Sequence, residues 1–285
     1  MKPQDSFIDI GIQIHIRKWL PPKSDTLEPA YLLIHGLASN ARTWDQVARL
    51  LAQRGYPTVA LDQRGHGLSQ KPENGYNFTS ITMDLRKIVG ELGLHRPVLA
   101  GQSWGGNVVL DFGARFPGTA QQLIFVDGGF LNLWQRGPWE TISLELRPPD
   151  LRGLPYTQMV SQIKKSHPYW SEDGIEATMA NFEKLPDGTV QPWLTLDRHM
   201  RILKALYEQD PDILYPRVQE PVLICAADDG SEWSVQKRKQ VQAALTGLEN
   251  AEVAWFYGAA HDIHVDQPEA LVARFLAFTN SITGL

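Results

Sequence analysis

The sequence has a single cysteine among its 285 residues. One cysteine cannot form an internal disulfide or a cage of thiolate metal ligands, which excludes a disulfide-stabilised scaffold and a cysteine-based metal domain. The sequence also lacks a strong charge of one sign: 27 Lys and Arg against 32 Asp and Glu give a formal net charge of −5. General nucleic-acid binders are strongly basic, so we expect no nucleic-acid partner.

Long hydrophobic runs are absent as well. Hydrophobic residues make up 43% of the chain, but they are spread over short runs. None approaches the roughly 20 residues that a membrane span requires. The first nine residues carry one lysine and no apolar stretch ahead of a small-residue cleavage site, unlike a signal peptide. We therefore expect a protein without a membrane span, located in the cytoplasm.

What is present is an alternation of strand and helix patterns. Residues 7–20 alternate apolar and polar side chains around Gly11, which predicts an antiparallel hairpin. Residues 30–34 form a continuous apolar run, typical of a strand buried on both faces. Further strands are predicted at 57–61, 97–100, 123–126, 221–226 and 252–257, and helices at 43–54, 81–92, 107–116, 234–245 and 268–282. This alternation predicts an α/β fold with a mostly parallel, doubly wound sheet.

Residues 131–216 interrupt the alternation, and no strand is predicted there. This segment holds four of the nine tryptophans and nine of the 19 prolines. We interpret it as a helical cap inserted into the sheet. The predicted domains are then a core of residues 1–130 and 217–285 and a cap of residues 131–216.

The sequence Gly101-Gln102-Ser103-Trp104-Gly105 follows one predicted strand and opens a predicted helix. In that context the pattern GxSxG predicts a nucleophile elbow, in which glycines are needed because side chains beside the sharp turn would collide with the neighbouring strand and helix. At the helix N-terminus, Ser103 also lies beside free backbone N–H groups that can hold an oxyanion. Ser103 is the candidate nucleophile.

A serine nucleophile needs a base and an oxyanion hole. His261 follows the last predicted strand and precedes the last helix, at the sheet edge where open α/β sheets bind ligands, so it is the candidate base. His264 lies in the same loop and is interpreted as a packing residue. The strand at 30–34 ends at His35-Gly36, beside the elbow, so the N–H groups of Leu37 and Trp104 are predicted to form the oxyanion hole.

These motifs, together with residues 62–69 and the sequence Asp266-Gln267-Pro268 after His261, resemble the α/β-hydrolase superfamily, in its capped, esterase-like branch. The resemblance covers residues 7–130 and 217–282, and the cap matches only in position. It implies a serine-histidine-acid triad and no cofactor. It leaves the substrate open, because esterases, thioesterases, lactonases, amidases and haloperoxidases share this set.

The acid is where the sequence departs from the family pattern. In most of the family it follows the strand after the cap, but nine residues after Pro221 the sequence has Gly230, preceded by Asp228 and Asp229. Asp127 instead ends the strand before the cap, 24 residues after Ser103. Some branches, the haloalkane dehalogenases among them, look similar at that strand end and take their acid there. We expect Asp127 to be the acid, with Asp229 and then Asp228 as alternatives.

Three further features are interpreted as structural. Asp62 and Arg64 are expected to pair and brace the glycine-rich loop at 64–69. The run at 237–239, Lys-Arg-Lys, is expected to be a solvated helix face. Cys225 falls in a predicted buried strand and is expected to be an inert packing residue.

The predicted function is hydrolysis of small to medium, mostly apolar carboxylic esters through an acyl-enzyme, without metal or cofactor. Trp134 or Trp139 of the cap is expected to line the acyl pocket. Serine in place of aspartate as the nucleophile disfavours epoxide hydrolysis and dehalogenation, which pass through an ester to an aspartate. The alternatives are an amide hydrolase of the proline-iminopeptidase kind, which the sequence at 103–106 also resembles, and a noncatalytic ligand receptor. The sequence leaves the oligomeric state open.

Overall fold

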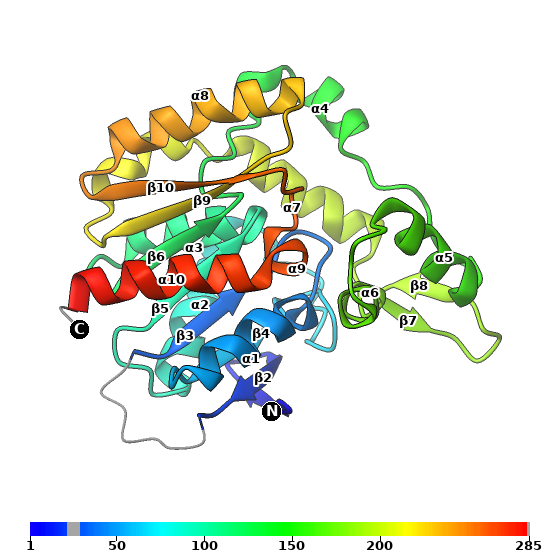
Figure 1. Cartoon of the computed structure of the whole chain (residues 1–285). Helices are drawn as coiled ribbons and strands as arrows, with labels where there is room; N and C mark the ends of the chain where they lie inside the picture. Colours follow the sequence, from blue (N-terminus) through cyan, green and yellow to red (C-terminus); the bar gives the residue numbers. More distant parts are fainter. Residues whose placement is uncertain (22–28, 284–285) are drawn as a thin grey trace.

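The computed structural model describes residues 1–21 and 29–283 of the chain, and its core is one eight-stranded sheet (Figure 1). The strands follow the spatial order β1-β2-β4-β3-β5-β6-β9-β10. Their bounds are β1 Gln4–Asp9, β2 Gln13–Trp19, β3 Tyr31–Ile34, β4 Thr58–Leu61, β5 Val98–Gln102, β6 Gln122–Val126, β9 Val222–Asp228 and β10 Ala251–Tyr257. β1 and β2 pair antiparallel, as the alternation at 7–20 predicts, and β2 also pairs antiparallel with β4. The neighbours in the remaining order β4-β3-β5-β6-β9-β10 pair parallel.

Helices cover both faces of the sheet (Figure 1), and its central strands β3, β5 and β6 are therefore buried on both sides. In β3, Leu32 and Ile34 join a core with α2, α3 and α8, whereas Tyr31 and Leu33 join a core with α1, α9 and α10. The helices are α1 Asp45–Gln53, α2 Phe78–Glu91, α3 Trp104–Arg115, α8 Glu232–Gly247, α9 Ile263–Asp266 and α10 Pro268–Thr283. The predicted doubly wound α/β fold is confirmed.

Element ends differ from the predictions for local reasons. α2 begins three residues earlier than predicted because the Asn77 side chain accepts a hydrogen bond from the N–H of Ser80 and caps the helix there. A short 3₁₀ helix, Ala41–Trp44, precedes α1. The turn α9, between β10 and α10, was not predicted, since four residues are too few for a helical period to be visible.

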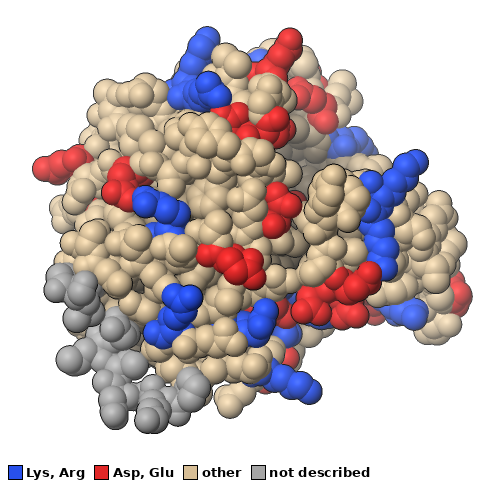
Figure 2. Space-filling model, viewed as in Figure 1, with Lys and Arg blue, Asp and Glu red and all other residues tan. Residues whose placement is uncertain are grey.

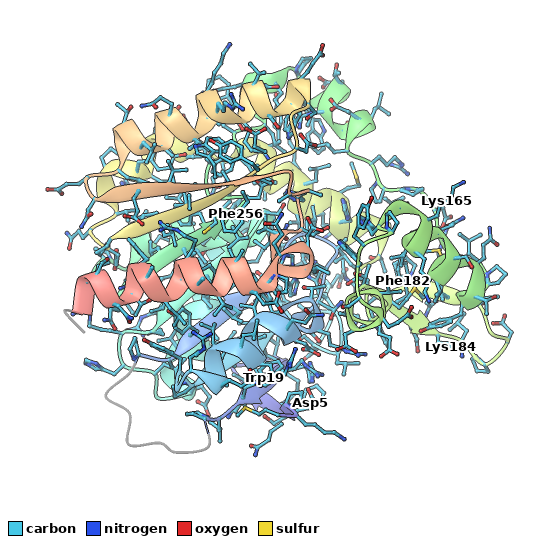
Figure 3. The ribbon with its side chains drawn as sticks, viewed as in Figure 1. Asp5, Trp19, Lys165, Phe182, Lys184 and Phe256 are labelled. Carbon is cyan, nitrogen blue, oxygen red and sulfur yellow. The ribbon has the colours of Figure 1, made fainter. Side chains whose placement is uncertain are left out.

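The segment between β6 and β9 contains α4 Trp139–Glu145, α5 Tyr156–Ser166, α6 Glu172–Met179 and α7 Leu196–Glu208. It also contains a two-stranded antiparallel sheet of β7 Phe182–Lys184 and β8 Val190–Pro192, so the prediction of no strand in this region is wrong. With three residues each, the two strands are too short for an apolar alternation to be visible in the sequence. They pack with α5 and α6 around a small core of their own that contains Met159, Met179 and Val190. Figure 3 labels Lys165, Phe182 and Lys184 in this lobe, well away from Phe256 in β10.

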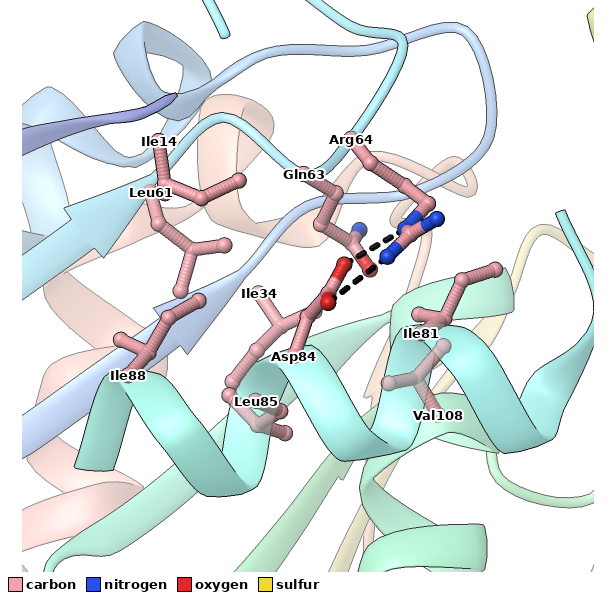
Figure 4. A pocket seen from close by; sticks show the side chains of 10 residues that line it. All are labelled: Ile14, Ile34, Leu61, Gln63, Arg64, Ile81, Asp84, Leu85, Ile88 and Val108. Carbon is pink, nitrogen blue, oxygen red and sulfur yellow. Dashed lines mark hydrogen bonds and ion pairs between the residues drawn. The ribbon is translucent and has the colours of Figure 1, made fainter. Parts of the chain in front are cut away.

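The predicted pair between Asp62 and Arg64 does not form. Asp62 instead accepts hydrogen bonds from the ring of His15 (2.9 Å) and from the N–H groups of Ala41 (2.7 Å) and Leu68 (2.9 Å). With that carboxylate occupied, Arg64 turns to Asp84 of α2 and donates from Nη2 to Oδ1 at 2.7 Å (Figure 4). The residues around this pair enclose a gap of only about 10 Å³, so they form packed core.

Charged side chains of both signs are interspersed over the face shown in Figure 2. No helix in the described part of the chain has the length and apolar character needed to cross a membrane.

Candidate active site

Ser103 occupies the turn between β5 and α3, with a φ of 54°, a left-handed conformation that non-glycine residues rarely adopt. The turn is tight enough that a Cβ on Gly101 would lie 2.2 Å from the carbonyl oxygen of Gly105. A Cβ on Gly105 would lie 2.5 Å from the carbonyl oxygens of Ile34 and His35 in the neighbouring strand and loop. The two flanking glycines are therefore required by contact with the backbone, as the elbow pattern predicts.

His261 lies after β10 and donates from Nδ1 to Asp127 Oδ2 at 2.7 Å. The other carboxylate oxygen of Asp127 accepts the N–H of Ala227 in β9 at 2.9 Å. Removal from water lowers the pKa of His261, but the hydrogen bond and negative charge of Asp127 outweigh this effect and raise the pKa above its ordinary value. Burial raises the pKa of Asp127, but its bonds to His261 and Lys237 hold that pKa below its usual range. Among the aspartates considered, Asp127 is the one brought to His261.

The two alternative acids hold the turn between β9 and α8. Asp228 accepts the N–H of Gly230 at 3.0 Å and forms an ion pair with Arg238. Asp229 is exposed and accepts the N–H of Ser231 at 2.9 Å and the hydroxyl of Ser234 at 2.8 Å. Both carboxylates therefore accept hydrogen bonds within the turn that follows β9, and Asp228 also pairs with α8.

Lys237 is buried, which contradicts the prediction of a solvated Lys-Arg-Lys face. Its Nζ donates to Asp127 Oδ2 at 2.8 Å and to the carbonyl of Ala227 at 2.9 Å. Lys237 is 7% exposed, whereas Lys239 on the same helix is exposed. Asp127 therefore accepts a second hydrogen bond, from the lysine ammonium, that the sequence did not predict. Lys237 lies one turn from Ser234 and Gln240, which are also buried, but this shared buried face is visible only in the structure.

Leu37 and Trp104 line the same cavity as Ser103 and His261. The N–H of Trp104 is the first of α3 and has no carbonyl one turn earlier within the helix to bond. Two neutral histidines hold the loop that carries Leu37. His35 Nδ1–H donates to the carbonyl of Gly36 at 2.7 Å while its Nε2 accepts the N–H of Gln63 at 3.0 Å.

The second of these histidines, His66, fixes the other side of the loop. Its Nε2 accepts the N–H of Ala38 at 3.3 Å, and its Nδ1–H donates to the carbonyl of Arg64 at 3.0 Å. Burial lowers the pKa of His66 well below its usual value and also lowers that of His35, which keeps both rings neutral. Both histidines lie in motifs visible in the sequence, but the sequence does not predict a role for either ring.

The cavity beside Ser103 has a volume of about 440 Å³. Its walls are mostly apolar: Phe130, Leu131, Leu133, Leu146, Leu203, Leu206 and Trp233. Arg136 and Glu145 also line it and form an ion pair with each other.

Trp134 and Trp139 do not line this cavity, contrary to the prediction that one of them forms the acyl pocket. Trp134 is 46% exposed in a short 3₁₀ helix, Trp134–Arg136. The Trp139 ring packs on Tyr207 of α7 with a centroid distance of 5.4 Å, and the Nζ of Lys204 lies 4.7 Å from it. Besides Trp104, the tryptophan that lines the cavity is Trp233, at the start of α8 and outside the predicted cap.

The part of the chain that the structure describes contains no group of three or more His, Cys, Asp or Glu side chains placed to hold a metal ion. His264 is fully buried against Trp44, at a ring centroid distance of 4.6 Å, and is a packing residue as predicted.

A model of the alpha/beta hydrolase family matches residues 31–274. Among curated proteins, an uncharacterized protein of Mycobacterium tuberculosis is 39% identical over 101 residues, 35% of this chain and 29% of that protein. The 2-(acetamidomethylene)succinate hydrolase of Mesorhizobium japonicum is 32% identical over 99 residues, 35% of each chain. These matches thus span about a third of the length of the curated relatives.

Solved structures resemble the whole chain. The crystal structure of E-2-(acetamidomethylene)succinate hydrolase superposes with a TM-score of 0.79 at 21% identity and covers 98% of this chain and 99% of its own. A thioesterase domain from the curacin biosynthetic pathway superposes with a TM-score of 0.78, also at 21% identity, over 97% of this chain and 100% of its own. At these identities the likeness establishes the fold.

Proposed function

Because the chain belongs to the alpha/beta hydrolase family, we propose that it is a serine hydrolase that cleaves carboxylic esters of small to medium, mostly apolar substrates through an acyl-enzyme intermediate. The observation that carries the proposal is the 2.7 Å hydrogen bond between Asp127 and His261 at the edge of the cavity that Ser103 lines. Ser103 is then the nucleophile, His261 the general base and Asp127 the acid.

Each residue of this triad has a defined step. Asp127 holds the proton on Nδ1 of His261, which leaves Nε2 free to take the Ser103 proton as Oγ bonds to the ester carbonyl carbon. The N–H groups of Leu37 and Trp104 stabilise the oxyanion. The carbon–oxygen bond to the leaving group then breaks, and His261 returns its proton to the departing alkoxide. Water, deprotonated by His261, hydrolyses the acyl-enzyme and regenerates Ser103.

The shape and lining of the cavity support a mostly apolar substrate. A volume of about 440 Å³ fits a small to medium molecule, and leucine, phenylalanine and tryptophan side chains provide most of its wall. Amide hydrolysis uses the same machinery. The hydrolase from Mesorhizobium japonicum, named for an acetamido substrate, makes matched amides a useful second set to test.

The first test is labelling with a fluorophosphonate probe, followed by turnover of 4-nitrophenyl esters of rising chain length and of the matched anilides. We expect stoichiometric labelling that Ser103→Ala abolishes, and ester turnover that exceeds anilide turnover. Absence of both labelling and turnover would exclude a serine hydrolase and favour the noncatalytic receptor. Faster cleavage of the anilides would favour the amide hydrolase.

The second test compares the three aspartates. Asp127→Asn should lower kcat by about 10⁴-fold, since an amide in place of the carboxylate stabilises the wrong histidine tautomer. Asp228→Asn and Asp229→Asn are the matched controls, because their carboxylates bond within the turn after β9. A loss of several orders of magnitude in Asp229→Asn with near-full activity in Asp127→Asn would assign the acid to the other strand.

A further inference from the structure

A second cavity, of about 620 Å³, lies between the loops that follow β3 and β4 and the segment that runs from the end of α4 into the first turn of α7. Its core-side wall includes Ala38, His66 and Lys71, and its other wall includes Phe182, Trp193 and Arg198. Phe182 is labelled in Figure 3, on the hairpin of the projecting lobe. Nothing in the proposed ester hydrolysis uses this space.

The second cavity adjoins the cavity of Ser103. His199 lines both cavities. Leu37 lines the first and its neighbour Ala38 lines the second. The ring of His66, in the wall of the second cavity, stacks on Trp104 at a centroid distance of 5.6 Å. A substrate whose scissile bond lies at Ser103 can therefore extend past Leu37 into this space.

Two cations of the second cavity have no acidic partner. The Nζ of Lys71 donates to the carbonyls of Gly67 (2.7 Å) and Ser69 (3.0 Å) and lies 4.6 Å from the centre of the Trp193 ring. Arg198 donates from Nη2 to the carbonyl of Lys71 at 3.0 Å. Among the residues that the structure describes, neither side chain forms an ion pair with an Asp or Glu.

The acids that line the cavity already have partners. Asp150 pairs with Arg152, an exposed pair at the rim, and Asp197 pairs with Arg201 on α7. Glu183 accepts from the side-chain amide of Gln191 across the small hairpin. Lys71 and Arg198 thus form no ion pair, although the charges of Asp62 and Glu183 act on Lys71 from a longer distance. Both cations lie beside partly apolar walls, where a charge-assisted hydrogen bond to an anion is stronger than in water.

We propose that Lys71 and Arg198 bind a carboxylate group of the substrate, so that the enzyme prefers esters with an apolar part at Ser103 and an anionic end in the second cavity. This inference rests on the proposed ester hydrolysis and adds the substrate class. The neutral rings of His66 and His199 leave the charge of this site to the lysine and the arginine, since burial lowers the pKa of His199 to about 4.

The test compares 4-nitrophenyl hexanoate with the mono-4-nitrophenyl ester of adipic acid, which carries a carboxylate at the far end and has the same leaving group. A second matched pair, 4-(butanoyloxy)benzoate and its methyl ester, places the carboxylate on the alcohol side. For one of the two pairs we expect kcat/KM to favour the anionic ester by about tenfold or more, the range of a charged hydrogen bond. The preference should decrease with added salt.

The variants Lys71→Met and Arg198→Met should each raise KM for the preferred anionic ester about tenfold and leave the neutral ester within twofold. Lys71→Arg, which keeps the charge, should retain the preference. Arg152→Met is the matched control, because it removes a cation of the same cavity that already forms an ion pair. This variant should leave KM unchanged for both the anionic and the neutral ester.

The outcomes separate this inference from the proposed function. Hydrolysis of the neutral esters without any preference for the anionic ones overturns the anion site and leaves the serine hydrolase intact. Equal losses on both substrates in Lys71→Met and Arg198→Met also overturn it, because the two residues would then act only on loop structure. If no ester is cleaved and Ser103 is not labelled, the proposed function itself fails.

Discussion

One carboxylate oxygen of Asp127, Oδ2, accepts hydrogen bonds from two side chains. His261 Nδ1 lies 2.7 Å from it and Lys237 Nζ 2.8 Å. The charge of Lys237 therefore opposes the effect of Asp127 on the histidine: Asp127 raises the pKa of His261, and Lys237 lowers it. If His261 is the base, Lys237 sets the pH at which it becomes available.

We predict that Lys237→Met raises the pKa of His261, because a positive charge that disfavours the imidazolium is removed. The base acts in its neutral form, so the acid limb of the kcat/KM profile should move to higher pH by about one unit. Measuring kcat/KM for a 4-nitrophenyl ester from pH 5 to 9 checks this.

Lys239→Met is the control for that profile, since Lys239 is exposed on the same helix. An acid limb that stays in place in Lys237→Met, while stability falls, would give Lys237 a purely structural role. A shift in both variants would point to a general effect of net charge.

Some of these contacts could be predicted from the sequence and others could not. Ser103 and His261 are visible because each follows a strong strand pattern and precedes a helix. Lys237 is not, because a lysine that opens a Lys-Arg-Lys run on a helix is solvated in most proteins, and only the nearby Asp127 supplies its anion. Trp233 was missed for a similar reason: its place at the cavity depends on how α8 packs.

At the scale of elements, the turn from β5 to α3 is fixed by neighbouring backbone. A Cβ on Gly128, after β6, would lie 2.0 Å from the carbonyl oxygen of Ser103, and one on Gly105 would lie 2.5 Å from that of His35. Backbone atoms cannot yield as a flexible side chain does. Three elements, β3, β6 and α3, thus hold Ser103 in its left-handed conformation.

We predict that Gly105→Ala destabilises the fold by about 1–3 kcal/mol, the range for overpacking a closely packed site, and lowers labelling of Ser103 more than the loss of folded protein explains. Urea unfolding and the labelling rate of the folded fraction measure the two effects. Gly90→Ala is the control, because Gly90 lies in α2 with open space around it. That change should stabilise by about 0.5–1 kcal/mol. Equal stability of the two variants would refute the steric argument.

Helices and strands could be predicted where their buried residues form a recognisable apolar pattern in the sequence. Central strands such as β3 and β9 are buried along their whole length and appear as apolar runs. The hairpin of β7 and β8 is not, since its strands alternate too briefly and pack on a small local core. The division into core and cap at residues 130/131 and 216/217 stays a prediction.

At the scale of the whole molecule, Asp62 connects the opening hairpin to the sheet and to the turn before α1. It is 3% exposed and accepts bonds from His15 of β2 and from Ala41 and Leu68. Burial alone would raise the pKa of Asp62. The hydrogen bonds and the nearby His35 have the larger, opposite effect and lower this pKa to about 2. A carboxyl whose pKa is lower in the folded than in the unfolded state stabilises the fold above its ordinary pKa, and this contribution disappears as the pH falls.

We predict that Asp62→Asn has a lower free energy of unfolding than the wild type at pH 6. The difference in free energy of unfolding should narrow by about 2 kcal/mol between pH 5 and pH 2, the range set by the ordinary and the lowered pKa of Asp62. Urea unfolding at steps of half a pH unit measures it. Glu249→Gln, at an exposed position, should keep a constant difference from the wild type. If the difference in free energy of unfolding between Asp62→Asn and the wild type does not change with pH, the partners of Asp62 do not stabilise its carboxylate form.

The aspartate at the end of β6 lies within a run of five residues with several uses. Asp127 accepts a hydrogen bond from His261, Gly128 leaves the space beside the carbonyl of Ser103 that a Cβ would fill, and Phe130 and Leu131 line the cavity. The chain then leaves the sheet toward α4. Anyone who recombines this sheet with the corresponding segment of another member of the family should therefore make the junction after Leu131, since an exchange made at the strand end would also replace residues that contact His261 and line the cavity of Ser103.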